Sequence, residues 1–92
     1  MNRGKGLQLR LYVAGNAPNS RLAIVNLNAL CDQHFEARFE LEIVDMLQHP
    51  LRALADGIIV TPTLLKLSPP PAGRVIGNLS DTSQLLLALG GK

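Results

Sequence analysis

The strongest constraint on the fold is a change of hydrophobic period that occurs twice in the first half of the chain. Residues 7–13 alternate apolar and polar side chains, the period of two that is typical of a strand. From Pro18 to about His34 apolar residues recur at helical spacing, and Pro18 suits a first helical turn. The period of two returns from Phe39 to near Asp45. Because short loops join these segments, the sequence predicts a βαβ unit with parallel strands and a right-handed crossover.

The second half of the chain predicts shorter elements. The spacing of apolar residues over 47–55 favours a short helix that ends at Gly57. The β-branched run 58–60 predicts the entry to a strand, which resumes over 64–67 and stops at Ser68. A run of prolines follows, and prolines continue neither a helix nor an interior strand.

The end of the chain predicts a hairpin strand and a last helix. Arg74–Ile76 is a short strand placed to pair antiparallel with the strand before it. Ser80 is placed to cap a helix that carries Asp81 in its first turn, continues to Leu89 and ends at the glycines 90–91. The predicted order is therefore βαβαββα, an α/β arrangement that is the order of the thioredoxin fold.

Length and composition set the size and the setting of the protein. With 92 residues the chain has room for one small domain, 1–92, in which 1–6 and 90–92 are expected to be disordered. A net charge of +2 without a basic patch containing aromatic residues argues against nucleic-acid binding. The single cysteine cannot form an internal disulfide, and the N-terminal region lacks the long apolar segment of a signal peptide. We therefore expect a cytoplasmic protein that binds neither nucleic acid nor a membrane.

The junction between the first strand and the first helix excludes thiol chemistry. An oxidoreductase of this fold keeps two cysteines there, and residues 16–19 are Asn-Ala-Pro-Asn. Cys31 lies further along the helix, on its predicted buried face. A phosphate cradle is also disfavoured, because the loop holds one glycine, Gly15, and no lysine. The junction is interpreted as a strand followed by a capped helix that begins with proline.

Two sparse sets of polar residues do not make a catalytic or metal site. Cys31 and His34 are three residues apart and His49 follows, but a tetrahedral zinc site needs further ligands. We interpret them as a core thiol and two surface imidazoles. Asp45 and Asp56 end a strand and a helix, where solvated carboxylates are ordinary. The sequence therefore predicts no metal, no cofactor and no enzymatic activity.

Several separated sequence blocks occur together in a recognisable order. They are LRLYVAGNAPNS, EIVD at 42–45, VTPTLLKL at 60–67, the three prolines, and RVIGNLSD at 74–81. Together they resemble the KaiB family of circadian clock proteins, over nearly the whole chain. The resemblance implies a non-enzymatic protein that binds the ATPase ring of a KaiC-like partner and modulates its phosphorylation cycle. In the full clock such a protein also captures KaiA and displaces SasA.

The resemblance also implies two folds for one sequence. One is a thioredoxin-like monomer, βαβαββα, that binds KaiC, and the other is a tetrameric ground state of order βαββααβ. We expect the thioredoxin-like form to dominate, because the periodicities predict it directly. The fold places a cis proline before its third strand, where a bare sequence would give a trans bond. The residues implied for the fold switch or the cis proline are Pro62, Pro70, Pro71, Gly77 and Asn78.

The same resemblance assigns a partner surface and limits the choice of partner. KaiA capture in the family uses cations on the first helix and second strand, where this chain has Leu22 for arginine and Glu42 for lysine. We therefore expect a divergent paralogue that binds a KaiC-like ring without recruiting KaiA. The alternative is a stand-alone thioredoxin-fold adaptor or stress-response protein with neither KaiC nor redox activity. The residues implied for ring binding are Gln48, Leu51, Leu54, Ala55 and Asp56.

The missing cysteine pair generates a direct test. The protein is expected to show no insulin-disulfide reductase activity in the presence of dithiothreitol, because no thiolate attacker and resolving partner lie at the junction. Cys31→Ser is expected to leave partner binding unchanged and to lower stability slightly. Turnover that Cys31→Ser abolishes would contradict the non-enzymatic interpretation.

Overall fold

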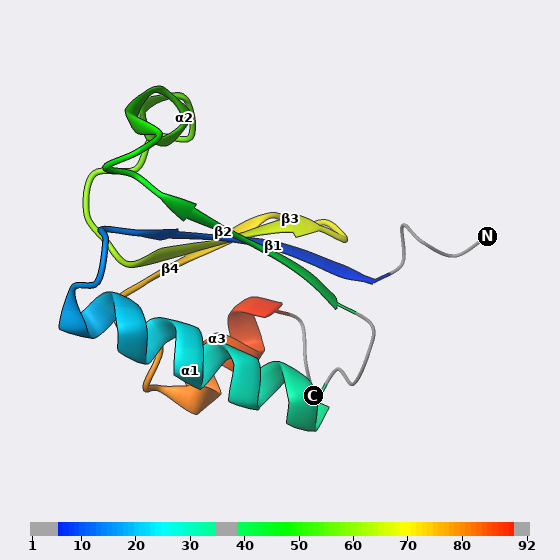
Figure 1. The fold of residues 1–92 in the computed structure, drawn as a ribbon. Helices are drawn as coiled ribbons and strands as arrows, with labels where there is room; N and C mark the ends of the chain where they lie inside the picture. Colours follow the sequence, from blue (N-terminus) through cyan, green and yellow to red (C-terminus); the bar gives the residue numbers. More distant parts are fainter. Residues whose placement is uncertain (1–5, 35–38, 90–92) are drawn as a thin grey trace.

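The structure is a computed structural model that describes residues 6–34 and 39–89 (Figure 1). Its elements follow the order predicted from the sequence. They are β1 (Leu7–Val13), α1 (Pro18–His34), β2 (Phe39–Asp45), α2 (Pro50–Ala55), β3 (Thr63–Ser68), β4 (Gly73–Ile76) and α3 (Thr82–Leu89). The predicted βαβαββα arrangement is thereby confirmed. Residues 1–5 and 90–92, for which disorder was predicted, lie outside the described residues, and Gly6 lies in a bend before β1.

The strands form a four-stranded sheet in the order β2-β1-β3-β4. β1 pairs parallel with β2 and antiparallel with β3, and β3 pairs antiparallel with β4. Figure 1 shows α1 and α3 together on one face of the sheet, and α2 standing at one end of the opposite face. The first face is therefore covered by two helices and the second by one short helix.

The main core lies between the sheet and the pair α1 and α3. The apolar positions of β1 point into it, with Leu11 fully buried and Leu9 almost so. Leu27 of α1 and Leu85 of α3 pack against them from the helical layer, and Cys31 is buried among them. The sequence prediction that Cys31 lies on the buried face of its helix is confirmed.

A second, smaller cluster lies on the opposite face beneath α2. Its buried members are Tyr12, Val44, Ala53, Ile58 and Leu65. Tyr12 belongs to the polar alternation of β1, yet it is completely buried because α2 and the residues after it cover that end of the sheet. The two faces of β1 therefore serve two separate cores.

Two predicted boundaries on either side of α2 are wrong. The helix begins at Pro50 rather than near Leu47, because Asp45 organises a turn before it: the Asp45 carboxylate accepts the Leu47 N–H at 2.9 Å. Residues 58–60 are not a strand. The Ile58 N–H bonds to the Ala53 carbonyl at 2.9 Å and closes the end of α2, so the chain is still turning there.

The start of α3 also differs from the prediction. The cap is Asp81 rather than Ser80, because the Asp81 carboxylate accepts the Gln84 N–H at 3.0 Å. The helix accordingly begins at Thr82. The glycines 90–91 that were predicted to end it lie outside the described residues.

The last helix provides a test of the fold in solution. We expect helical backbone chemical shifts over Ser83–Leu89 and the sedimentation of a monomer, because the segment carries a carboxylate cap and buries Leu85 and Leu89. Strand-like shifts over Ser83–Leu89, or a tetramer, would favour the alternative βαββααβ form.

Candidate functional site

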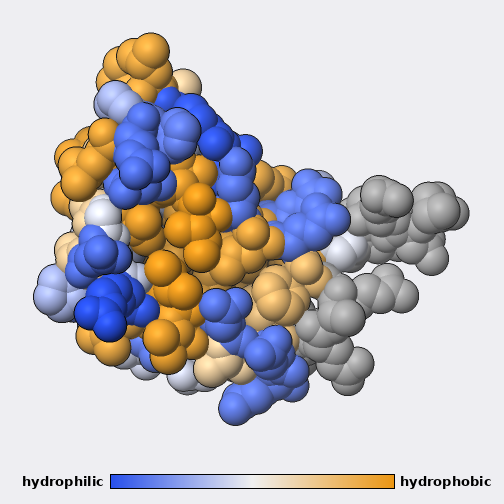
Figure 2. Space-filling model, in the orientation of Figure 1, coloured by the Kyte–Doolittle hydropathy of each residue, from blue (hydrophilic) through white to orange (hydrophobic). Residues whose placement is uncertain are grey.

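The most exposed apolar residues of the second face lie on and around α2. Leu47, Leu51 and Leu54 are 70%, 78% and 74% exposed. Figure 2 shows this hydrophobic tip protruding from the top of the molecule, in the place of α2 in Figure 1. The neutral side chains of Gln48 and Ala55 are also exposed. We call these residues the α2 surface: Leu47, Gln48, Leu51, Leu54 and Ala55.

Two exposed β-branched residues follow the helix. Ile59 is 89% exposed and Val60 is 46% exposed. The sequence analysis interpreted them as part of a strand and did not assign them to the partner surface. Their neighbour Ile58 turns inward and is buried. The three residues are all apolar and β-branched, so the sequence carries no signal that separates Ile58 from the two exposed residues.

The helix itself has little apolar anchoring. It spans Pro50–Ala55, and Ala53 is its buried residue. Its first turn has Pro50 in place and no side-chain cap from His49. A helix of this length is not stable alone in water, so contacts with the rest of the chain must hold it.

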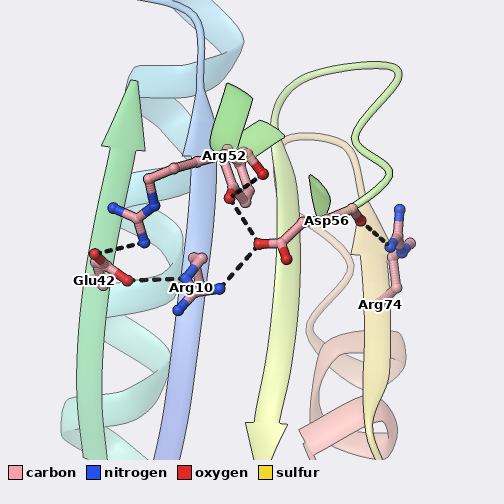
Figure 3. Close-up of polar contacts among 6 residues, drawn as sticks. Arg10, Glu42, Arg52, Asp56 and Arg74 are labelled. Atoms are coloured by element: carbon pink, nitrogen blue, oxygen red, sulfur yellow. Dashed lines mark hydrogen bonds and ion pairs between the residues drawn. The ribbon is translucent and has the colours of Figure 1, made fainter. Parts of the chain in front are cut away.

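Polar side chains on the sheet supply those contacts. The Asp56 carboxylate accepts from the Tyr12 hydroxyl at 2.7 Å and from Nη1 of Arg10 at 2.9 Å (Figure 3). The Tyr12 oxygen also lies 3.0 Å from the Arg52 carbonyl oxygen. The Tyr12 hydroxyl has one proton to donate, and the charged Asp56 carboxylate, at the shorter distance, is the stronger acceptor. The end of α2 is thus tied to β1.

Glu42 extends this arrangement to β2. Its two carboxylate oxygens pair with Nε of Arg10 and Nη2 of Arg52, each at 2.8 Å (Figure 3). Arg10 therefore bridges two carboxylates, one on the sheet and one on the turn after α2. We call this set the Asp56 network: Arg10, Tyr12, Glu42, Arg52 and Asp56.

Arg74 of β4 holds the same turn from its other side. Its Nη2 donates to the Asp56 carbonyl at 2.8 Å (Figure 3). Its Nη1 donates to the Gly57 carbonyl at 3.0 Å. These carbonyls belong to the end of a helix, where backbone acceptors lack partners within the helix. The planar guanidinium suits two neighbouring acceptors.

The network shifts the ionisation of its members. The Tyr12 hydroxyl bond, followed by the Arg10 bond, lowers the pKa of Asp56 against the opposing effect of burial. The bonds from Arg10 and Arg52 lower the pKa of Glu42, and the bond to Glu42, followed by that to Asp56, raises the pKa of Arg10. Burial raises the pKa of Tyr12. The charged forms of both carboxylates are therefore favoured by the fold.

The prediction that Asp45 and Asp56 are ordinary solvated residues is wrong. Asp45 accepts the N–H groups of Gly15 and Leu47 through its Oδ1. The Asp56 side chain is 27% exposed and is engaged with Tyr12 and Arg10. Of the residues predicted to bind a partner, Asp56 therefore faces the sheet, whereas the other four lie on the α2 surface.

The residues implied for the fold switch lie around the β3–β4 region. The Thr61–Pro62, Ser68–Pro69 and Pro70–Pro71 bonds are cis. Pro62 is buried directly before β3, and Pro70 and Pro71 are exposed. Gly77 has φ +116° and donates its N–H to the Pro62 carbonyl at 3.0 Å, so this position suits glycine.

Asn78 and its neighbours form a tight turn before α3. The Asn78 side-chain oxygen accepts the Ser80 N–H at 3.1 Å. The Asn78 backbone carbonyl accepts a hydrogen bond from the Asn26 side-chain amide of α1 at 2.9 Å. Leu79 follows with φ +65°, a conformation that is uncommon for leucine, and its side chain is buried. The sequence analysis missed both Asn26 and Leu79, since neither carries a local signal for this turn.

The sequence candidates for other chemistry are placed apart. Burial raises the pKa of the Cys31 thiol to about 11, with a smaller contribution from Asp32, so the reactive thiolate is disfavoured. His49 precedes α2 on the other face of the sheet, and the His34 side chain lies outside the described part. Within residues 6–34 and 39–89, no three potential metal ligands come together. No helix in those residues has the length and hydropathy needed to cross a membrane.

Comparisons with known proteins identify the family. Residues 10–90 match the KaiB domain. The chain belongs to the KaiB family. The predicted resemblance to the KaiB family is thereby confirmed.

Relatives of this KaiB-family chain are circadian clock proteins. It is 46% identical to the circadian clock oscillator protein KaiB of Cyanothece sp., over 88% of this chain and 77% of that protein. It is 44% identical to the circadian clock protein KaiB3 of Synechocystis sp., over 97% of this chain and 84% of that protein.

Solved structures show a thioredoxin-like fold. The N-terminal domain of Synechococcus elongatus SasA has a TM-score of 0.76 at 22% identity, over 92% of this chain and 84% of that one. Chloroplastic thioredoxin z has a TM-score of 0.76 at 17% identity, over 92% of this chain and 76% of that one. At such identities the likeness concerns the fold alone.

The lowered pKa of Asp56 generates a pH prediction. A carboxylate whose pKa is depressed by folding contributes stability above its ordinary pKa of 3.8, and this contribution is lost as the pH falls through the folded value. We expect Asp56→Asn to cost about 1–2 kcal/mol near pH 7. Between about pH 5 and pH 2 the free energy of unfolding of the Asp56→Asn variant should fall less steeply than that of the wild type.

Urea unfolding measured across this pH range checks the expectation. Glu40→Gln is the control, because it makes the same charge change at an exposed position of β2. Equal slopes for the wild type and Asp56→Asn would show that the carboxylate contributes nothing through its ionisation.

Proposed function

We propose that this KaiB-family protein binds a KaiC-like ATPase ring through the α2 surface and modulates the phosphorylation cycle of that ring. The exposure of Leu47, Leu51 and Leu54 on one short, firmly anchored segment supports the proposal. Such a protruding apolar segment is typical of an interaction site, since water otherwise solvates it at a cost.

The energetics of the α2 surface are adequate for docking. Burying one leucine side chain contributes roughly 1.5–3 kcal/mol. Leu51 and Leu54 are three residues apart and so project from neighbouring positions of α2. Together with Leu47 they can serve as the central anchors of an interface, around which the neutral Gln48 and Ala55 add contact without charge.

The proposed role is a binding role in the cytoplasm, without catalysis. The single thiol lies in the main core and its pKa is raised to about 11, which opposes redox exchange. The carboxylates of the Asp56 network are occupied by Tyr12, Arg10 and Arg52. The bonds of these carboxylates hold α2 in place, so their proposed role is structural rather than catalytic.

A substitution at the centre of the α2 surface tests the proposal. Leu51→Asp is expected to weaken binding to the organism's KaiC-like ring by about tenfold or more, because a carboxylate would be buried in an apolar contact. The folded state should be retained, since Leu51 is 78% exposed. The measurement is the affinity for the ring under ATP-hydrolysing conditions.

Leu87→Asp provides the matched control. Leu87 is 80% exposed on α3, in the helical layer of the other face. The Leu87→Asp variant is expected to bind the ring as the wild type does. Equal losses for both variants would rule out the α2 surface as the site. A wild type that does not bind the ring would instead favour the stand-alone adaptor, which needs no KaiC.

We also propose that ring binding occurs without recruitment of KaiA. Leu22 is 47% exposed on α1, where the resemblance places an arginine. Glu42 stands where a lysine is usual, and it is held by Arg10 and Arg52. Two cations are thus replaced by a neutral and a negative group, and a reversed charge at a desolvated interface costs several kcal/mol by order of magnitude.

A ternary assay with KaiC and KaiA tests this expectation. Glu42→Lys alone would place a lysine beside Arg10 and Arg52, so it is combined with Arg52→Glu to retain an ion pair, and with Leu22→Arg. The triple variant is expected to gain KaiA capture that the wild type lacks. The variant Arg52→Glu alone controls for damage to ring binding. Robust KaiA capture by the wild type would contradict the charge argument.

A further inference from the structure

Tyr12 lies where a single hydroxyl reaches two points of the α2 segment. Its oxygen is 2.7 Å from the Asp56 carboxylate and 3.0 Å from the Arg52 carbonyl oxygen. Residues 52 and 56 are one helical turn apart. A group that contacts both constrains where the segment lies and also how it is rotated about its axis.

We propose that Tyr12 is a positioning residue for the α2 surface: its hydroxyl sets the pose in which the exposed leucines meet their partner. The part of this inference that concerns the partner rests on the proposed function. Tyr12 is completely buried, so a partner docked on the exposed leucines cannot touch it. Any effect of its hydroxyl on affinity must therefore act through the placement of α2.

The space beside α2 explains why a directional contact is needed there. A wide surface depression of about 570 Å³, open to solvent, lies between the end of the helix and the β3–β4 hairpin, and Ala55, Asp56, Leu65 and Arg74 are among its lining residues. Side chains do not fill this space, so close packing cannot fix the helix on that side. Hydrogen bonds to its last turn must do so.

The charged neighbours of Tyr12 strengthen the contact. Arg10 bonds to the same Oδ2 atom of Asp56 that accepts the hydroxyl proton. This pairing keeps the carboxylate ionised and oriented, and hydrogen bonds to charged acceptors are stronger than neutral ones. Arg74 bonds to the Asp56 carbonyl, so the side chain and the backbone of one residue are held from two strands. Tyr12 is the member of this arrangement that can be altered without changing a charge.

The first experiment is native-state hydrogen exchange of Tyr12→Phe, with no partner present. The reporters are the N–H groups of Asp56, Gly57 and Ile58, which bond within the α2 turn. Their exchange is expected to accelerate about threefold to a hundredfold, the range that corresponds to the net loss of one hydrogen bond to a neutral or a charged acceptor. The N–H groups of α1 should accelerate less than these reporters.

The second experiment measures the affinity of the same variant for the KaiC-like ring. Tyr12→Phe is expected to weaken binding about three- to tenfold. In the background of Leu51→Asp, where the α2 contact is already disrupted, the same change should have little further effect. Cys31→Ala is the stability control, because it removes a buried atom from the core on the other face.

Each outcome decides the inference. Faster exchange confined to the α2 turn together with weaker binding supports it. Unchanged exchange at the reporters, unchanged affinity, or an equal acceleration throughout α1 overturns it, as does an equal loss of affinity in Cys31→Ala. If the wild type does not bind the ring, the proposed function fails and the part of the inference about the partner fails with it. The exchange experiment still decides whether Tyr12 holds α2.

Discussion

The carboxylate of Asp56 is the contact on which the display of the α2 surface depends. The helix buries one residue of its own, Ala53, and exposes its leucines, so apolar burial contributes little to its orientation. Tyr12 and Arg10 hold the Asp56 side chain, and Arg74 holds its carbonyl. Removing this carboxylate would leave the buried Tyr12 hydroxyl without its charged acceptor and Arg10 paired with Glu42 alone. A buried donor left without a partner costs more than its bond contributes. Because hydrogen bonds to Asp56 hold the segment in place, its leucines are not needed for this and can remain exposed.

Glu42 shows how one substitution can serve the fold while changing the surface. From the sequence it was interpreted as a charge reversal that removes a cation used for KaiA. In the structure it lies between Arg10 and Arg52 and connects β2 to both. Each of these partly exposed pairs contributes only about 0–1 kcal/mol. Their value is that Arg10 pairs with both Glu42 and Asp56, so the charges form one connected set rather than isolated pairs.

The sequence predicted the elements well where a long period was present. The bounds predicted for β1, α1 and β2 agree with the structure, since seven or more residues repeat one pattern there. The short elements were less certain: Asp45 delayed the start of α2, and the run 58–60 was taken for a strand although Ile58 closes the helix. Local patterns do not show which carboxylate will accept a backbone N–H.

The Asp56 network could not be predicted from the sequence in the same way. Tyr12 and Asp56 are 44 residues apart, and Arg10 and Asp56 are 46 apart, so only the tertiary fold brings them together. The spacing of the leucines predicted a short helix, and their assignment to a partner surface came from the resemblance and stays a prediction. What the sequence concealed was the turn of Asp56 toward the sheet, because a helix end is ordinarily solvated.

Successive side chains of β1 point to opposite faces of the sheet, so one strand contributes to the main core and also holds α2. Leu11 points into the main core with α1 and α3, and its neighbour Tyr12 points into the small cluster beneath α2. Because the two residues lie on opposite faces of one strand, a change in the second cluster does not open a cavity in the first. The main core therefore supports the fold without depending on the exposed leucines of the α2 surface, while the same strand offers a hydroxyl and a cation to Asp56 on its other face.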